Sequence, residues 1–179
     1  PISVKHRIGV DDFDSYDFLC DFVETVSNTG CKVFIIHARK AWLKGLSPKQ
    51  NREIPELNYD RVYQLKRDFP ELEIIINGGI SSIQDSVDHL HELDGVMIGR
   101  EAYTNPYMLA EVDQKIYGKE KSIIKREEIA EKFCQYVDNE MVKGEKLHSM
   151  TRHILGLFRG VKGAKQFRRH ISENAQGEK

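Results

Sequence analysis

Short apolar runs alternate along the first hundred residues with stretches in which apolar residues recur every three or four positions. The runs lie at 1–5, 33–36, 73–80 and 95–100, and each ends in charged residues or glycine. Such runs are typical of buried parallel strands, and the stretches between them predict helices. A strand–helix order repeated four times predicts an α/β fold that amounts to half of a (β/α)8 TIM barrel.

The helical stretches have recognisable limits. Asp14 is a candidate N-cap for the first helix, and Pro70 ends the second. The apolar faces that the spacing predicts are formed by Leu19, Phe22, Val23 and Val26 in the first, Val62, Leu65 and Phe69 in the second, and Ile83, Val87 and Leu90 in the third. Residues 41–56 form a long loop, which inside a compact domain is usually functional or disordered.

Beyond Asn105 the strand–helix alternation stops. Asn105 and Pro106 predict the start of a last barrel helix, which Gly118 ends. Helical spacing then resumes at Ile129, Phe133, Val137 and Met141, and again at Leu147, Met150, Ile154 and Phe158. We therefore predict a C-terminal barrel half at 1–118, a linker at 119–121 and a small all-helical domain at 122–179, frayed at 176–179.

Glycine ends the third and fourth predicted strands at neighbouring positions. Asn77, Gly78 and Gly79 follow one strand, and Gly99 and Arg100 follow the other. Glycine lets the backbone approach a bound group, and the next helix offers unpaired N–H groups, a geometry that holds a phosphate. Two such turns match the phosphate site after the last two strands of a TIM barrel, although a single glycine turn can be purely steric.

Length and charge limit the choice of function. The chain has 179 residues, fewer than the roughly 250 of a complete barrel, and it begins with Pro1, so we expect part of a longer polypeptide. The net charge is −1, but residues 143–170 contain eight Lys or Arg and one acid, so that a basic arm (+7) follows an acidic body. With three unpaired cysteines and no membrane span or signal peptide, we predict a cytoplasmic protein.

Several motifs together resemble the tRNA-dihydrouridine synthases, specifically their A subfamily. They are VKHRIG from Val4 to Gly9, the string HARKAWLKGLSPKQNR from His37 to Arg52, NGGI from Asn77 to Ile80, and IGR from Ile98 to Arg100. The long string is the specific one, and the resemblance covers essentially the whole chain. It implies an FMN enzyme that uses NADPH to reduce the C5–C6 bond of uridines at positions 20 and 20a in the D-loop of tRNA.

The resemblance also implies roles for individual residues. Lys5 is expected beside the flavin ring, where its charge stabilises negative charge on the reduced cofactor. His37 is expected to contact FMN, and the FMN phosphate is expected among Asn77, Gly78, Gly79, Gly99 and Arg100. Considered alone, Lys5 could be a solvated lysine at a strand end and His37 a structural histidine. No metal is predicted, because no ligand cluster has metal-binding spacing.

The predicted contacts with tRNA are basic side chains. By resemblance they are Lys49 and Arg52 in the long loop, and Lys165 and Arg168 on the last helix. Lys162, Lys165, Arg168 and Arg169 recur at helical spacing there and predict one basic face. Taken alone, such charges could equally be a solvated surface. Lys and Arg bind phosphates without reading sequence, so we expect recognition of tRNA shape, followed by movement of the uridine out of its stack.

One family feature is missing. The proton donor in this family is a cysteine in the first half of the barrel, and none of Cys20, Cys31 and Cys134 lies in its motif. We assign no catalytic acid and predict that the chain alone is inactive. A half barrel also exposes strand edges, which favours self-association. The alternatives are a non-catalytic RNA-binding fragment and a barrel that binds a sugar phosphate.

Overall fold

The computed structural model describes residues 2–120 and 122–175. The chain divides into two compact units, Pro1–Gly99 and Arg100–Lys179. This division precedes the linker predicted at 119–121, of which residue 121 lies outside the described residues, as do the predicted frayed residues 176–179. The assignment of functional domains on either side of that linker stays a prediction.

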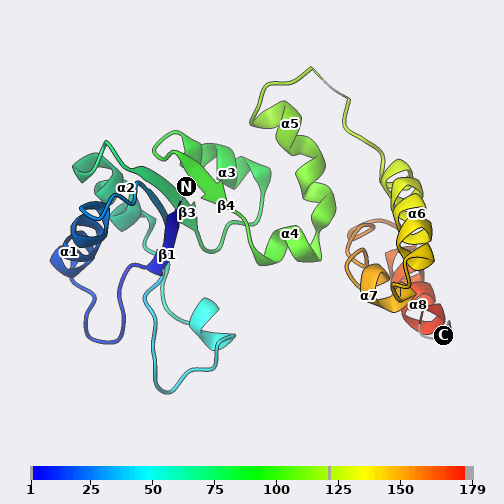
Figure 1. Cartoon of the computed structure of the whole chain (residues 1–179), viewed down its shortest axis with the longest axis horizontal. Coiled ribbons are helices and arrows are strands. Elements are labelled where there is room, and N and C mark those ends of the chain that lie inside the picture. Colours follow the sequence, from blue (N-terminus) through cyan, green and yellow to red (C-terminus); the bar gives the residue numbers. More distant parts are fainter. Residues whose placement is uncertain (1, 121, 176–179) are drawn as a thin grey trace. The chain divides into compact units, whose positions relative to one another are not determined.

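A four-stranded parallel sheet forms the centre of the N-terminal unit (Figure 1). Its strands β1 (Ser3–Arg7), β2 (Val33–His37), β3 (Glu73–Asn77) and β4 (Gly95–Met97) lie side by side in the order of the sequence. Arg7 pairs with His37, His37 with Asn77, and Asn77 with Met97. The carboxyl ends of all four strands therefore lie at one edge, which confirms the predicted strand order and the parallel α/β class.

One face of the sheet is packed and the other is partly open. Side chains on the packed face alternate along β2 and β3 and are fully buried, namely Phe34, Ile36, Ile74 and Ile76. They share a core with residues of the helices α1 (Tyr16–Ser27) and α2 (Tyr59–Asp68), namely Leu19, Val23, Val62 and Leu65. The intervening residues Ile35, His37, Ile75 and Asn77 are only half-buried. This two-residue period separates the structural face from the face that bears the candidate chemistry.

The helix N-termini of this unit are capped by side chains. Ser15 caps α1 by accepting a hydrogen bond from the Phe18 N–H. The prediction that Asp14 caps α1 is wrong, because the Asp14 carboxylate instead forms an ion pair with Lys40 at 2.7 Å. In α3 (Ile83–Leu90) the cap is Ser82, which forms a reciprocal capping box with Asp85. A capping box satisfies two N–H groups at once, so the start of α3 is well defined.

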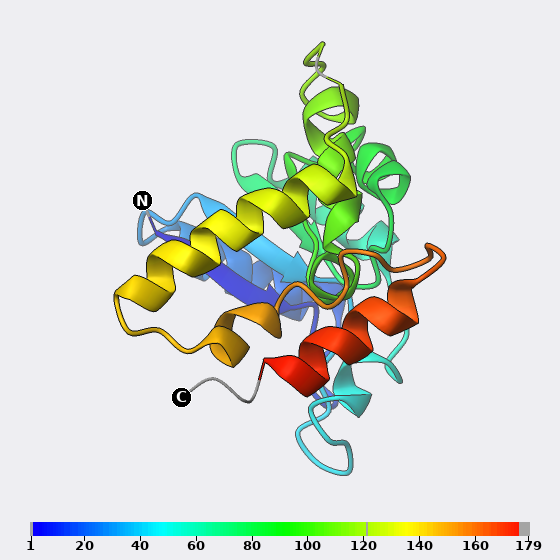
Figure 2. The same cartoon turned by 90° about the vertical axis from the view of Figure 1, so that its right-hand side faces the viewer.

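The C-terminal unit is helical but more broken than its apolar spacing predicts (Figure 2). The single helix predicted after Asn105 is instead a 3-10 helix, η2 (Pro106–Glu111), continued by α5 (Val112–Lys115) and preceded by α4 (Arg100–Thr104). The long helix α6 (Arg126–Val142) is as expected. The next helix, α7 (Leu147–Thr151), stops early, and α8 (Ala164–Asn174) follows a run of turns. Lys162 therefore lies before α8, not on it.

Close packing explains why the chain between α7 and α8 is not helical. A Cβ at Gly156 would lie 2.4 Å from the carbonyl oxygen of Thr104, so only glycine fits there. Arg159 forms an ion pair with Glu101 at 2.9 Å. The rings of Phe158 and Phe167 lie 4.7 Å apart and attach α8 to this segment. Contacts to α4 thus override the helical spacing of residues 147–158.

Candidate functional site

The half-open face of the sheet brings Lys5 and Asn77 together. The Lys5 ammonium donates a hydrogen bond to the side-chain oxygen of Asn77 at 3.0 Å. The Asn77 side-chain NH2 donates to the carbonyl oxygen of Met97 at 2.8 Å. These two bonds fix which way the Asn77 amide faces, with its oxygen toward the cation. Two of the predicted site residues, from the first and third strands, are therefore in direct contact.

Positive charge gathers at this edge of the sheet. Partial burial lowers the pKa of the Lys5 ammonium, and the Arg7 guanidinium lowers it further. Burial also lowers the pKa of Arg7, with the charges of Arg39 and Arg52 as additional causes. Cations that disfavour one another's charged forms are stabilised by a bound anion. The edge is thus electrostatically suited to an anionic ligand or an RNA phosphate.

The double-glycine turn after β3 fits closely against its neighbours. Gly78 and Gly79 have φ angles of +115° and +71°, in the region that favours glycine. A Cβ at Gly78 would lie 3.2 Å from the His37 ring, and one at Gly79 would lie 2.5 Å from a methyl group of Leu57. The predicted site residue His37 therefore packs directly against the predicted phosphate turn. Gly78 is buried and Gly79 is exposed.

The other predicted phosphate residues fall at the division between the two units. Gly99 is exposed and ends the N-terminal unit, and Arg100 is exposed and begins α4. A Cβ at Gly99 would meet no atom within 4 Å. Whether these two residues join the double-glycine turn around one phosphate stays a prediction.

The long loop is organised by side chains at its base. The Arg7 guanidinium donates to the carbonyl oxygens of Lys40 and Asn51, each at 2.8 Å. The Asn51 side chain accepts from the Trp42 N–H at 2.8 Å and donates to the Trp42 carbonyl at 2.6 Å. The loop is therefore a defined structure with its own hydrogen bonds.

Both predicted tRNA contacts of this loop lie around its 3-10 turn, η1 (Gln50–Arg52). Lys49 is the residue before the turn and Arg52 is its last residue, and both are exposed. A preorganised loop holds such charges in place at a smaller entropic cost on binding.

The predicted RNA contacts in the C-terminal unit share one face of α8. Lys165 and Arg168 lie three residues apart and are both exposed, so they project from the same side of the helix. Phe167 anchors the other side through its ring contact with Phe158. Arg169 differs from these two residues because it forms an ion pair with Glu173 at 2.7 Å. Within 122–175 neither Lys165 nor Arg168 forms an ion pair.

The three cysteines belong to separate elements of the chain. Cys20 is on α1, where burial raises the pKa of its thiol. Cys31 is buried before β2, at the opposite end of the sheet from His37, and Cys134 is exposed on α6. Among the described residues no group of three or more His, Cys, Asp or Glu side chains could hold a metal ion.

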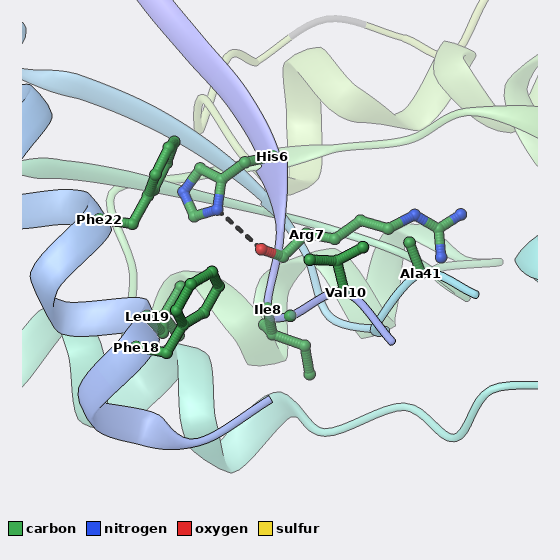
Figure 3. A pocket seen from close by; sticks show the side chains of 9 residues that line it. His6, Arg7, Ile8, Val10, Phe18, Leu19, Phe22 and Ala41 are labelled. Atoms are coloured by element: carbon green, nitrogen blue, oxygen red, sulfur yellow. Dashed lines mark hydrogen bonds between the residues drawn. The ribbon is translucent and has the colours of Figure 1, made fainter. Parts of the chain in front are cut away.

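A separate apolar cavity of about 330 Å³ lies between β1 and α1 (Figure 3). Its lining includes His6, Phe18 and Phe22, and the His6 ring lies 4.9 Å from that of Phe22. Strand alternation places His6 on the face opposite Lys5 and Arg7. The cavity therefore lies mainly on the face opposite Lys5 and Asn77, although Arg7 is also among its lining residues.

Comparison with known families gives one match that spans the chain. The family model described as dihydrouridine synthase (Dus) matches residues 1–179. The chain belongs to the dihydrouridine synthase family.

Individual relatives of this family agree. The chain is 58% identical over 176 residues to a tRNA-dihydrouridine(20/20a) synthase of Vibrio cholerae, covering 98% of the chain and 54% of the relative. It is 58% identical over 175 residues to that of Shewanella oneidensis, covering 98% of the chain and 52% of the relative. It is 57% identical over 176 residues to the tRNA-dihydrouridine(20/20a) synthase of Escherichia coli K12, covering 98% of the chain and 51% of the relative. The chain spans about half the length of these dihydrouridine synthases.

Some residues that shape the site were not predicted from the sequence. Arg7 was predicted only as one residue of the motif that ends at Gly9, although its two-residue spacing from Lys5 already indicates the same face. Asn51, Leu57 and Tyr59 were missed altogether. Each acts through contacts with residues distant in sequence, so no local pattern indicates its role.

Proposed function

We propose that this chain is the part of a tRNA-dihydrouridine(20/20a) synthase that holds the FMN phosphate and contacts tRNA. The observation that carries the proposal is the identity of 57–58% to synthases of that name over 98% of the chain. At that identity the chain and its relatives share one fold, and the motifs around the candidate site lie within the matched region.

The proposal includes the fold of the complete protein, a TIM barrel of which this chain supplies the second half. Support comes from the sheet, whose strands follow the sequence order β1-β2-β3-β4. A doubly wound sheet reverses its order at a switch point, whereas a barrel adds each strand beside the last. The partly open face bearing Lys5 and Asn77 then corresponds to the barrel interior.

The residues of the N-terminal unit fit a flavin phosphate. A turn of two glycines with positive φ, next to a group of cations, is suited to a phosphate ester. We assign the phosphate to Asn77, Gly78, Gly79, Gly99 and Arg100, and the flavin ring to Lys5 and His37. Bound FMN supplies the hydride for the uridine C5–C6 bond after reduction by NADPH. Lys5, oriented by Asn77, holds a positive charge where the reduced cofactor is negative.

The tRNA is assigned to two basic surfaces. Lys49 and Arg52 present charges from the loop held by Arg7, and Lys165 and Arg168 present them from α8. Contacts of this kind position an RNA by its phosphates.

No cysteine of the chain is assigned as proton donor, so we expect catalysis only from a longer polypeptide. We expect that polypeptide to act in the cytoplasm. Among the described residues no helix could span a membrane.

A chimaeric enzyme tests this proposal. The matching segment of the Escherichia coli K12 relative is replaced by this chain, and the chimaera is expressed in a strain that lacks the native enzyme. We expect dihydrouridine to return at tRNA positions 20 and 20a, measured by mass spectrometry of digested tRNA. Asn77→Ala in the chimaera serves as the site control and is expected to reduce the amount of dihydrouridine strongly.

Two results would contradict the proposal. A folded chimaera that binds tRNA but forms no dihydrouridine would favour the non-catalytic RNA-binding alternative. A folded chimaera that binds sugar phosphates but not tRNA would favour the sugar-phosphate barrel.

A further inference from the structure

A side chain from α2 holds the backbone of the double-glycine turn. The Tyr59 hydroxyl, at the first position of α2, donates a hydrogen bond to the carbonyl oxygen of Gly78 at 2.7 Å. Tyr59 is half-buried and Gly78 is buried. Buried carbonyl groups need a partner, and here a side chain provides it. The bond therefore fixes the direction of one peptide unit in the turn.

The direction of the Gly78 carbonyl determines the direction of the next N–H group. The described chain has no cis peptide bond, so the unit that joins Gly78 to Gly79 is trans. In a planar trans peptide the C=O and N–H bonds point in opposite directions. With the Gly78 carbonyl directed at Tyr59, the Gly79 N–H points away from α2. Gly79 is exposed, and within the described residues its N–H makes no hydrogen bond.

Tyr59 is itself held in place by two helices. Its ring lies 4.6 Å from the His89 ring in an edge-on contact, and His89 is only 6% exposed. The His89 Nδ1 lies 2.6 Å from the Tyr63 hydroxyl. Leu57 fills the space beneath both glycines. The carbonyl is thus fixed to a packed support between α2 and α3, not to a mobile side chain.

We propose that Tyr59 is a positioning residue, whose hydroxyl orients the Gly78–Gly79 peptide so that the Gly79 N–H donates to an oxygen of a phosphate monoester. The inference rests on the proposed function, in which that monoester is the phosphate of FMN. A donor that already points at the ligand needs no reorganisation when the anion binds. Tyr59 acts from behind the turn and does not touch the ligand.

The test compares two flavins that differ only in the phosphate. FMN and riboflavin are titrated separately into the unmodified chain, Tyr59→Phe and Tyr16→Phe, following flavin fluorescence. Tyr59→Phe keeps the ring and removes the hydroxyl. The control Tyr16→Phe removes a hydroxyl that bonds Asp68, far from the turn.

The expected result depends on the phosphate. Loss of one neutral hydrogen bond predicts that Tyr59→Phe raises the Kd for FMN about three- to tenfold and leaves that for riboflavin unchanged. Tyr16→Phe changes neither. An unchanged FMN affinity in Tyr59→Phe would overturn the inference, and so would equal weakening of both flavins, which would indicate general destabilisation.

A second probe separates this inference from the proposed function. Inorganic phosphate is titrated into the ¹⁵N-labelled chain while the amide resonance of Gly79 is followed. If FMN does not bind to the unmodified chain, the flavin function fails for this chain. A phosphate-dependent shift at Gly79 that is smaller in Tyr59→Phe would then still support the inference, and no shift would overturn it.

Discussion

At Gly79 the backbone has a φ of +71°, and a Cβ would lie 2.5 Å from Leu57 and 2.8 Å from the Tyr59 hydroxyl. We predict that Gly79→Ala lowers the free energy of unfolding by about 2–4 kcal/mol, from backbone strain and overpacking together. It should also abolish FMN binding, because the turn must move. Urea unfolding followed by circular dichroism gives the first quantity and a flavin titration the second.

Gly45 offers a matched control for that substitution. Its φ is +83°, but a Cβ there would meet nothing within 4 Å. Gly45→Ala should therefore lower the free energy of unfolding only through backbone strain, by about 1 kcal/mol. Equal losses of stability in the two variants would show that packing against Leu57 and Tyr59 does not constrain the turn.

His6 gives a prediction about pH. Burial lowers the pKa of the His6 imidazole below its ordinary value, the Lys5 charge lowers it further, and its bond to the Arg7 carbonyl opposes them. As pH falls through about 6.5 the unfolded chain binds this proton and the folded chain does not, so stability is lost on acidification. On acidification the His6→Phe variant should lose less free energy of unfolding than the unmodified chain, with a difference of up to about 1.4 kcal/mol per pH unit.

Urea unfolding at about pH 7.5 and about pH 5.5 checks this difference, with the window set by the ordinary pKa of histidine. His89, whose pKa burial also lowers, remains in both proteins and so cancels from the comparison. An identical pH dependence in the two proteins would mean that His6 is not a source of acid sensitivity.

At this scale the sequence predicted the residues that end strands, because strand ends at one edge of a parallel sheet must lie together. Lys5 and Asn77 are in contact as that argument requires. The sequence did not predict Tyr59, which reaches a carbonyl 19 positions further along the chain. Nor did it predict that the Asp14 carboxylate would pair with Lys40, leaving the cap to Ser15.

At the scale of elements, α8 carries the clearest prediction. Lys165 and Arg168 share one exposed face, so each should contact a phosphate independently. We predict that Lys165→Ala and Arg168→Ala each weaken tRNA binding and each reduce the slope of log K against log salt by about 1. Filter binding across a salt series measures both quantities.

Lys132 on α6 is the control for these variants. It is exposed in the same unit and pairs with Glu128 at 2.8 Å. Lys132→Ala should leave the tRNA affinity and its salt dependence unchanged. A reduction of the slope as large as those of the α8 variants would mean that the unit binds by its overall charge and not by this face.

The elements of the N-terminal unit were predicted better than those of the C-terminal unit. Each strand and helix of the first unit has an apolar pattern of its own, and glycine or proline marks several of the boundaries between these elements. In the second unit, apolar spacing predicted helix through residues 147–158, yet Gly156 fits against Thr104 and the helix ends at Thr151. Spacing reports which residues are buried, and a buried irregular segment gives the same pattern.

At the scale of the whole molecule, β1 is one of the two edge strands of the sheet, and it is the one beside the apolar cavity (Figure 3). An unpaired edge strand with apolar neighbours favours pairing with another chain. We predict that the chain alone associates with a second copy through this surface. Phe18, which is 39% exposed and lines the cavity, is the residue to alter.

Sedimentation velocity at several concentrations measures this association. Phe18→Asp should shift the distribution toward monomer, since a buried charge opposes the contact. Val142→Asp, at a residue that is 90% exposed in the other unit, should have no effect. A monomer at all concentrations for the unmodified chain would argue against association through β1.

Titration of FMN into the unmodified chain tests the central claim most directly, with quenching of flavin fluorescence as the signal. The account predicts saturable binding that Arg100→Ala weakens, because the arginine is assigned to the phosphate. A chain that is folded by circular dichroism but shows no saturable binding would contradict the claim that this part of the synthase holds the cofactor.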